Sequence, residues 1–524
     1  MQKTAFYEII PFSNSNLREK GRVSNHRRLL KVHYTILLLR FVTEMCVFIE
    51  EVLASFRPVI RGEKAFACFI ILVCGFMLRI DYLGVTSIVR ALALRPEVYD
   101  ALVHFCHASS WDLTLIRHCW WETIAKCMPL YQECGMYIFI ADGVKQSKEG
   151  KRIPGVKRLH QESETQSKSE YIFGHMLGCV GVLIGSGGIL FCLAASLRLH
   201  DGLQECAAWV GGQACWALSH VVQLFMDCSD VTQYIGGPAI VVMDRYFLTV
   251  PGLLMLQQLN NTRAVHLDVI IQAKKNCIAY ELPPAREPGQ RGRPRQKGDK
   301  VPVAALFQTR CDAFIPAKVE LYGKIQDLRY YCVNLLWGKG LYQELRFVLV
   351  EMSNGRQSIF VCTKLDLDPL TIIRFYSYRF KIENCFREFK QVFAGLKYRF
   401  WSKFMPKLDH YSKTTDPTPL SFVTDLKERE GILKTIRSNE IYILLACIAM
   451  GITQAISIFF DTEGLRGKLR FQRTAPKKIS EANVVDYLRS HFQLFLSNAP
   501  QDSILHLIRK RQIDPLNHMG NWVA

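Results

Sequence analysis

The sequence contains no two cysteines spaced as Cys-x-x-Cys, although it has 18 cysteines. Zinc ribbons and redox-active dithiols use such pairs, so the sequence argues against both classes of site. Thiols that are scattered singly are typical of small apolar core residues in a reducing compartment. The sequence also lacks an internal repeat, so it gives no indication of a repeat architecture.

Uninterrupted apolar runs of membrane-spanning length are scarce, and the first residues, MQKTAFYEIIPF, do not predict a signal peptide. The run at 65–78 is too short to cross a bilayer. The run at 172–197 is broken by Gly-Ser-Gly-Gly and predicts two buried strands and a turn. The best candidate span, 441–460, contains Gln454 and favours a buried helix. A basic integral membrane protein is therefore the third-ranked interpretation.

Acidic residues are outnumbered, because 47 Asp and Glu stand against 66 Lys and Arg, which gives a formal net charge of +19. Such a balance predicts a polyanionic partner, either nucleic acid or an anionic membrane surface. A merely basic enzyme is the alternative. Hydrophobic residues make up 49% of the 524 residues. This fraction argues against global disorder and allows several domains with sizeable cores.

The apolar pattern divides the chain into five segments. Residues 1–130 favour helices, compatible either with a helix-turn-helix kind of DNA binding or with an ordinary bundle. The pattern over 131–275 predicts the order strand, strand, strand, helix, strand, helix, strand. Three further segments follow: a basic linker and strand-rich region at 276–367, a helical region at 368–462, and a basic C-terminal region at 463–524 that we expect to contact DNA or a second subunit.

Three carboxylates carry the candidate chemistry. Asp142 and Asp244 each follow a short apolar strand, YIFIAD and AIVVMD, so neighbouring strand ends would place them side by side. A helix beginning near Pro369 supplies Glu383. Carboxylates brought together in this way can hold two divalent cations about 3.5–4 Å apart for phosphoryl transfer. Hard oxygen ligands suit Mg²⁺ or Mn²⁺.

Further functional groups surround Glu383 on the expected helix. Tyr376, Arg379 and Lys390 lie at offsets that place all four residues on one broad helix face. Arg379 and Lys390 are suited to holding phosphates beside the metals. The alternative for these flanking residues is an ordinary exposed helix surface.

This set of residues resembles the DDE transposases of bacterial insertion sequences, specifically the family-four type with the YREK signature. The resemblance rests on IAD and VVMD, on the full YREK spacing within YSYRFKIENCFREFKQ from Tyr376, and on GRPRQKGDKV from Gly292. It covers roughly residues 130–460. Two departures are Arg245-Tyr246, where small residues are common, and Phe380, where a Trp is frequent.

The resemblance implies an α/β fold: a ribonuclease H-like catalytic core with a β-rich insertion and a helical N-terminal domain. It implies a catalytic and metal-binding triad of Asp142, Asp244 and Glu383 that holds two Mg²⁺ or Mn²⁺ ions. The implied activity is strand cleavage at transposon ends followed by strand transfer into target DNA. The implied partners are double-stranded DNA and a second subunit in a synaptic complex, in a cytoplasmic, nucleoid-associated setting without a membrane. A catalytically inactive, transposase-derived DNA-binding protein is the alternative.

Expected DNA contacts extend beyond the triad. They comprise Lys145, Arg291, Arg293, Arg295, Tyr376, Arg379, Lys390 and Trp337. The three arginines lie in a Pro/Gly-rich basic segment, which can enter a minor groove of DNA. The alternative is that this segment is a solvated linker. Trp337 ends an apolar strand before a glycine, so it either stacks on an exposed base or packs inside the strand-rich region.

Overall fold

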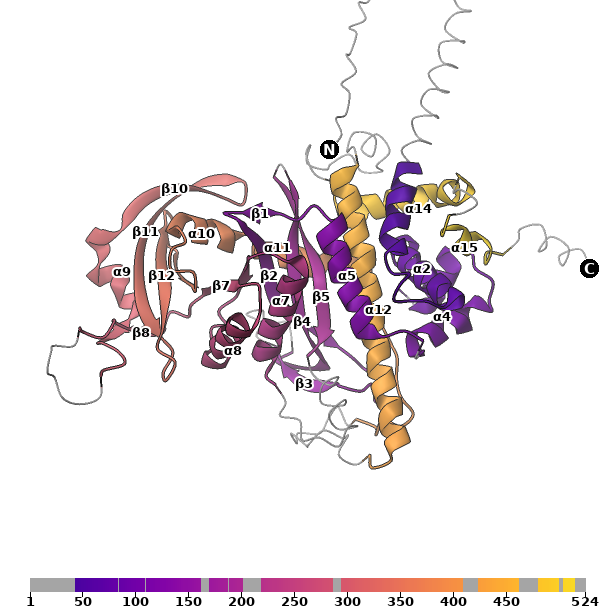
Figure 1. Ribbon diagram of the computed structural model, residues 1–524, viewed down its shortest axis with the longest axis horizontal. Helices are drawn as coiled ribbons and strands as arrows, with labels where there is room; N and C mark the ends of the chain where they lie inside the picture. Colours follow the sequence, from indigo (N-terminus) through magenta and orange to yellow (C-terminus); the bar gives the residue numbers. More distant parts are fainter. Residues whose placement is uncertain are drawn as a thin grey trace, which may run out of the picture.

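Helices of both chain ends, a large mixed sheet and a strand-rich extension follow one another along the long axis of this computed structural model (Figure 1). The fold is mixed α/β, as the sequence predicts. The structure describes the residues 43–82, 84–108, 110–161, 169–186, 188–200, 218–285, 294–408, 423–460, 479–498 and 503–513.

The helical region joins the first and the last described elements of the chain. Its helices are a segment at 43–54, α2 (Glu63–Leu78), α3 (Val85–Ala91), α4 (Val98–His107), α5 (Leu113–Cys127), α12 (Leu426–Phe459), α14 (Glu481–Asn498) and α15 (His506–Arg509). Contacts join α2 to α12, α14 and α15. Every residue of α2 from Phe66 to Leu78 is buried, because this helix is apolar on all sides and can be covered only inside a bundle.

The central sheet carries its strands in the order β5-β4-β2-β6-β7. These strands are β2 (Met136–Ser147), β4 (Tyr171–Ser186), β5 (Ile189–Leu199), β6 (Ala239–Met243) and β7 (Leu267–Gln272), with short β1 (Gln132–Glu133) and β3 (Lys157–His160) paired to β2 and β4. β2, β6 and β7 run parallel, whereas β4 is antiparallel to both β2 and β5. All five residues of β6 are buried, which fits a parallel strand covered on both faces.

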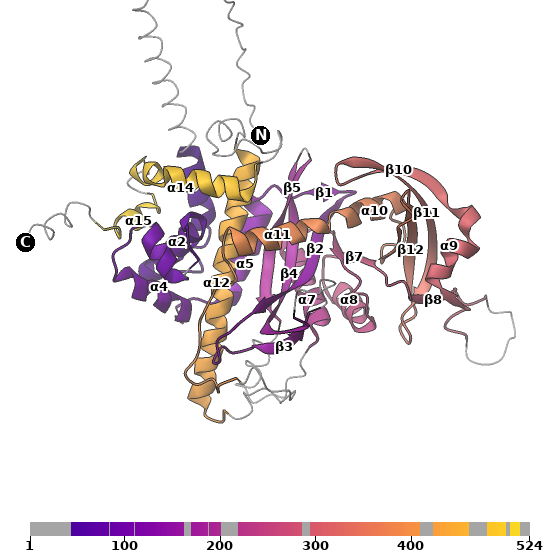
Figure 2. The same cartoon turned by 180° about the vertical axis from the view of Figure 1, so that it is seen from behind.

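Helices cover the two faces of this sheet. α7 (His220–Ile235) and α8 (Val250–Thr262) lie on one face, and α11 (Phe380–Gln391) crosses the other, as the two opposite views show (Figures 1 and 2). Ser219 and Thr249 cap the first turns of α7 and α8 through their hydroxyls. Each cap satisfies a free backbone N–H of the first turn and so stabilises the start of its helix.

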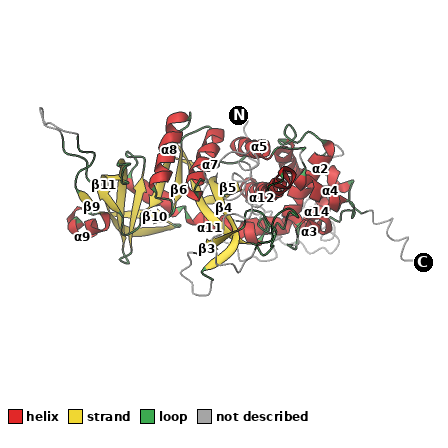
Figure 3. Cartoon of the chain, turned by 90° about the horizontal axis from the view of Figure 1, so that it is seen from below, coloured by secondary structure: helices red, strands yellow, loops and turns green. Residues whose placement is uncertain are grey.

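The strand-rich region extends the same sheet beyond β7. Its elements are β8 (Ile278–Tyr280), β9 (Lys300–Pro302), η1 (Val303–Ala305), α9 (Leu306–Thr309), η2 (Cys311–Ala313), β10 (Ile315–Leu321), β11 (Lys324–Trp337), β12 (Gln343–Met352) and β13 (Gln357–Cys362). β13 pairs antiparallel with β7, so one 13-stranded sheet connects the two regions. Figure 3 shows the strands of both regions in yellow. The Asn-Gly dipeptide at 354–355, which predicts a hairpin turn, joins β12 to β13, with Gly355 at φ 78°.

The order predicted over 131–275 matches the longer described elements β2, β4, β5, α7, β6, α8 and β7, and the short strands β1 and β3 are additional. Two local predictions are wrong. Asp142 lies inside β2 rather than at its end, because β4 pairs with β2 as far as Ser147. The single helix expected over 369–393 is two helices, α10 (Pro369–Ser377) and α11. At their junction, the backbone N–H of Arg379 bonds to the carbonyl of Tyr376, three residues back, so the regular four-residue ladder is interrupted.

Of the described helices, α12 alone has the length and apolar composition to cross a membrane. Its most apolar 18-residue window is 94% buried against the rest of the protein. The run at 172–197, which also imitated a span, forms the hairpin β4–β5. Both apolar runs are therefore buried inside the protein, which is the interpretation that the sequence favours.

Candidate active site

Asp142 and Asp244 lie side by side because their strands are parallel neighbours. The register pairs Ile140 with Val242, and each aspartate stands two residues beyond that pair. Glu383 approaches from the first turn of α11, which contacts β2 and β5. The structure thus brings together three carboxylates that are far apart in the sequence.

A single arginine joins the three carboxylates. One terminal nitrogen of Arg379 lies 3.0 Å from Oδ2 of Asp142 and 3.9 Å from Oδ2 of Asp244. The other donates to Oε1 of Glu383 at 3.0 Å. Arg379 is the residue before α11, so the break between α10 and α11 directs its guanidinium into the carboxylate cluster. A planar guanidinium with several donors suits this bridging position.

The cluster carries an excess of negative charge that Arg379 only partly offsets. Burial raises the pKa of Asp142 to about 6, and the nearby charges of Asp244 and Glu383 add to the rise while Arg379 opposes it. A backbone N–H donates to each aspartate, from Gly143 and from Tyr246, both at 2.8 Å. The like charges of Asp244 and Glu383, although smaller causes of this rise than burial, favour an additional cation at the cluster.

Among the described residues, no group of three or more His, Cys, Asp or Glu side chains is arranged to hold a metal ion. The guanidinium of Arg379 stands between the carboxylates and accounts for their spacing. Glu383 is 63% exposed at its side chain, so its rotamer is not locked by packing. The oxygen donors and their charge fit Mg²⁺ or Mn²⁺, and Arg379 occupies the centre that a cation would share.

The other residues that we expect to contact DNA lie on different elements around the carboxylates. Tyr376 is on α10 and donates its hydroxyl to Oε1 of Gln272 at 3.2 Å. Lys390 lies seven residues after Glu383 on α11 and is half-buried. The basic residues after Asp142 predict a loop, but Lys145 lies in β2 and donates to the carbonyl of His160 at 2.6 Å. The expected single helix face is therefore divided between two helices.

A cavity of about 380 Å³ opens beside the two aspartates. Cationic and aromatic side chains share its lining with the carboxylates, which gives a surface suited to a phosphate-bearing ligand. The lining residues are Asp142, Gly143, Lys145, Arg158, Leu159, His160, Met176, His220, Asp244, Tyr246 and Phe247.

A buried polar chain that sequence reasoning missed leads from this cavity into the protein. His220 lines the cavity, and its Nδ1 lies 2.7 Å from Nδ1 of His200. His200 in turn lies 3.0 Å from Oδ2 of Asp227, which also pairs with Arg198. Burial lowers the pKa of His220 to about 3, with His200 adding to the shift, so it is neutral at neutral pH. His220 and Asp227 are two helical turns apart, which was the available sequence signal.

The basic segment that includes the three expected arginines is only partly described. Arg295 is exposed, whereas Arg291 and Arg293 lie outside the described residues. Lys297, two residues after Arg295, lies 3.8 Å above the ring of Tyr280. Its contact with β8 ties this end of the segment to the strand-rich region.

Trp337 is half-buried at the end of β11 and packs against the core of the strand-rich region. Burial raises the pKa of the neighbouring Cys277 thiol to about 11, and the side chain of Trp337 opposes that rise. This geometry favours packing over base stacking. Tyr322 of the strand-rich region makes an aromatic contact with α11, because its ring centre is 5.3 Å from that of Phe380.

We expect Trp337→Ala to lower the free energy of unfolding by about 2–4 kcal/mol, because it removes a large, partly buried ring. Equilibrium unfolding in urea measures this change. Ile325→Ala on the same strand is the matched control, since Ile325 is 74% exposed and should cost less than about 1 kcal/mol. Equal stability of the two variants would contradict packing of the indole.

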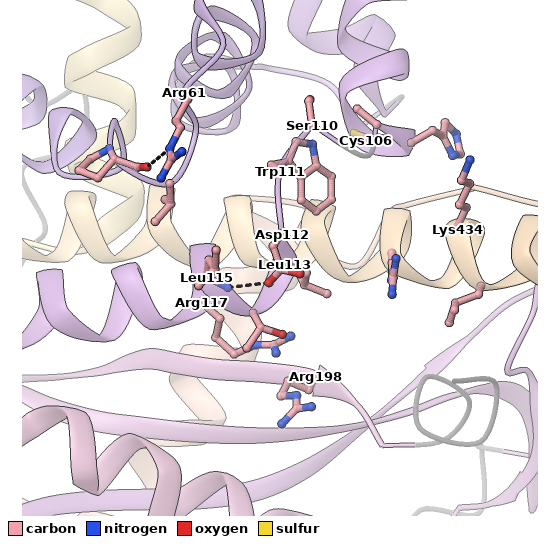
Figure 4. Close-up of a pocket in the computed structure, with 17 residues that line it drawn as sticks. Arg61, Cys106, Ser110, Trp111, Asp112, Leu113, Leu115, Arg117, Arg198 and Lys434 are labelled. Carbon is pink, nitrogen blue, oxygen red and sulfur yellow. Dashed lines mark hydrogen bonds between the residues drawn. The ribbon is translucent and has the colours of Figure 1, made fainter. Parts of the chain in front are cut away.

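A larger cavity, of about 640 Å³, lies away from the carboxylates between α4, α5 and α12 (Figure 4). Arg117 and Arg198 point toward it, but each is paired with a buried carboxylate, Glu440 and Asp227 respectively. The charges of its inner arginines are thus already neutralised, and we assign no chemistry to it.

No protein-family model matches this chain, and no curated protein matches it.

Proposed function

We propose that the protein is a DDE-type DNA transposase that uses Asp142, Asp244 and Glu383 for metal-dependent phosphoryl transfer. The observation that carries the proposal is the convergence of these three carboxylates on one guanidinium from two adjacent strands and a helix. Residues 102 and 139 positions apart in the sequence would not be expected to meet by chance at one charge centre.

We further infer that the sheet β5-β4-β2-β6-β7, with α7 and α8 on one face, is the ribonuclease H-like core that the resemblance implies. The strand order and the mixture of parallel and antiparallel neighbours support this inference. The strand-rich region enters the chain between Asp244 and Glu383, where the resemblance places an insertion.

The carboxylates are proposed to hold two Mg²⁺ or Mn²⁺ ions, which would activate the attacking oxygen and stabilise the leaving oxygen. Arg379 is suited to a phosphate oxygen once its carboxylate partners are engaged. Lys145 and Lys390 flank the centre and are proposed to neutralise neighbouring phosphates. The Gly143 and Tyr246 amides hold the two aspartates in fixed rotamers.

The proposed substrates are double-stranded transposon ends and target DNA, handled by a synaptic dimer in a nucleoid-associated setting. The net charge of +19 supports a polyanionic partner. The rival proposal is an inactive, transposase-derived DNA-binding protein. The three carboxylates support catalysis, since a protein that only bound DNA would lose affinity by placing them near phosphates.

Metal-dependent cleavage separates the two proposals. We expect the protein to nick a duplex that contains the DNA flanking its coding region when Mg²⁺ or Mn²⁺ is present, and not in excess chelator. Denaturing electrophoresis of an end-labelled duplex measures the nicks, and Ca²⁺, a larger and less strictly octahedral cation, serves as the metal control. Binding of the duplex without cleavage in either metal would favour the inactive protein.

A further inference from the structure

Two segments that lie far apart in the sequence form one groove where β2 and α11 end. Residues 146–153 continue from β2, and residues 396–407 follow α11. Together they line a cavity of about 610 Å³. β2 carries Asp142 and α11 carries Glu383, so the groove is built on extensions of the two elements that hold catalytic carboxylates.

Backbone bonds fasten the two segments together. The N–H of Ser402 donates to the carbonyl of Arg152 at 3.1 Å, and the N–H of Leu408 donates to the carbonyl of Lys151 at 2.7 Å. The guanidinium of Arg152 donates to the carbonyl of Lys403 at 2.6 Å. The groove therefore has fixed walls.

A buried lysine forms its floor. The Nζ of Lys148 donates to the carbonyls of Leu396 and Tyr398, at 2.9 and 3.0 Å, and lies 3.3 Å above the Tyr398 ring. Burial lowers the pKa of Lys148 to about 7, and the adjacent charges of Lys397 and Arg399 add to this shift. The cations thus lie close enough to repel one another, and an anion between them would relieve that repulsion.

The lining of the groove is strongly basic. Its cations are Lys148, Lys151, Arg152, Lys397, Arg399 and Lys407, against the single carboxylate of Glu149. Lys151, Lys397, Arg399 and Lys407 are exposed, and none of these four forms an ion pair within the described part of the chain. Exposed cations without counter-charges that share one groove are suited to a chain of phosphates.

An exposed indole stands among these cations. Trp401 lines the groove and is 61% exposed. Aromatic rings beside cations bind single-stranded nucleic acid, because an unpaired base offers its face for stacking. In a duplex both faces of each internal base are covered by neighbouring bases, so an indole gains little there.

We propose that this groove binds a single-stranded segment of DNA, with a base stacked on Trp401 and phosphates at Lys397 and Arg399. The inference rests on the proposed function and specifies where an unpaired strand leaves the catalytic centre. From Asp142 to Ser147, β2 covers about 17 Å, at roughly 3.4 Å per residue. A stacked strand of about five nucleotides spans that distance.

Binding of short oligonucleotides to the full-length protein tests the groove. With a labelled oligothymidylate of about 12 nucleotides, we expect Trp401→Ala to weaken binding roughly 5- to 100-fold and Trp401→Phe to retain most of it. Binding of a duplex of the same length should change less than about threefold, since the stacked bases do not engage the indole. Fluorescence anisotropy gives both dissociation constants, and thermal unfolding checks that each variant is folded.

Charge substitutions provide a second test of the groove. Lys397→Gln combined with Arg399→Gln should reduce the slope of log K against log salt by about 1.4 for the single strand, since each contact contributes about 0.7. Lys64→Gln combined with Arg509→Gln removes the same charge from exposed positions in the helical region and should leave the slope unchanged.

The outcomes separate the groove from the proposed function. A protein that cleaves DNA but whose Trp401 and Lys397/Arg399 variants bind the oligonucleotide like the control pair would overturn the groove alone. A protein that binds the single strand with the expected dependence but never cleaves would support the groove and contradict the catalytic proposal. Failure of the unmodified protein to bind the oligonucleotide would also overturn the groove.

Discussion

Asp142→Asn, Asp244→Asn and Glu383→Gln are each expected to lower the rate of strand cleavage by at least about 10³-fold, because each removes an anionic ligand from the proposed metal centre. Arg379 would remain in place in all three variants, but with fewer carboxylates to offset its charge. Single-turnover cleavage of an end-labelled duplex measures the rates. A cleavage rate like that of the unmodified protein would remove the substituted residue from the triad.

The matched control is Glu388→Gln on the same helix. Glu388 pairs with Arg387 and, within the described part of the chain, forms no hydrogen bond or ion pair with the three carboxylates or with Arg379. Its loss should therefore change the rate less than about threefold. Duplex binding should be nearly unchanged in the triad variants and in the control. This comparison separates loss of chemistry from loss of DNA affinity.

Stability gives an independent measurement on Asp142. Its pKa is raised to about 6, above the ordinary value, so the folded state disfavours the charged form and loses stability as the pH rises through 4 to 6. Asp142→Asn removes this penalty and should stabilise the metal-free protein by up to about 3 kcal/mol at pH 8. Urea unfolding at pH 5 and pH 8 measures it, and the gain should be smaller at pH 5.

Asp227→Asn is expected to lower the free energy of unfolding by about 3–5 kcal/mol, the largest stability effect that we predict. Asp227 is 3% exposed and accepts from Arg198 and from His200. An amide leaves the guanidinium of Arg198, whose side chain is 18% exposed, without its counter-charge. Equilibrium unfolding at neutral pH measures the loss.

Asp230→Asn on the same helix is the control for Asp227. Asp230 pairs with Arg263, and their side chains are 34% and 25% exposed, so the substitution should cost less than about 1 kcal/mol. Equal losses in the two variants would mean that the buried chain from Asp227 to His220 contributes nothing beyond an ordinary surface ion pair.

The contribution of Asp227 also depends on pH. Burial alone would raise its pKa, but Arg198 and His200 outweigh burial and lower the pKa to about 2, below its ordinary value. The stability gained from the charged form is therefore complete above pH 4 and is lost as the pH falls toward 2. The difference between the unmodified protein and Asp227→Asn should shrink over that window.

The elements of the core were predictable because their signals are local. The short apolar strands before Asp142 and Asp244 were recognisable from consecutive residues. The three carboxylates could be selected from these two apolar runs and from the YREK spacing, although Asp142 lies inside β2 and the spacing spans two helices. The hairpin β4–β5 likewise followed from Gly-Ser-Gly-Gly.

The placement of the same residues depended on contacts between distant segments. β2 runs past Asp142 because β4, formed some thirty residues later, continues to pair with it. The buried chain through His220, His200 and Asp227 requires α7 to pack on β4 and β5, which no local pattern specifies.

The sequence by itself determined the short apolar strands that lead to Asp142 and Asp244 and the hairpin β4–β5, because apolar runs and turn residues act over a few positions. Only the tertiary structure decided that Arg379 would join the three carboxylates, since this depends on the break between α10 and α11 and on the packing of α11 across β2. It likewise decided that the basic segments after β2 and after α11 would form one groove. Electrostatic and packing energies depend on distances in space, and these are set by pairings between residues hundreds of positions apart.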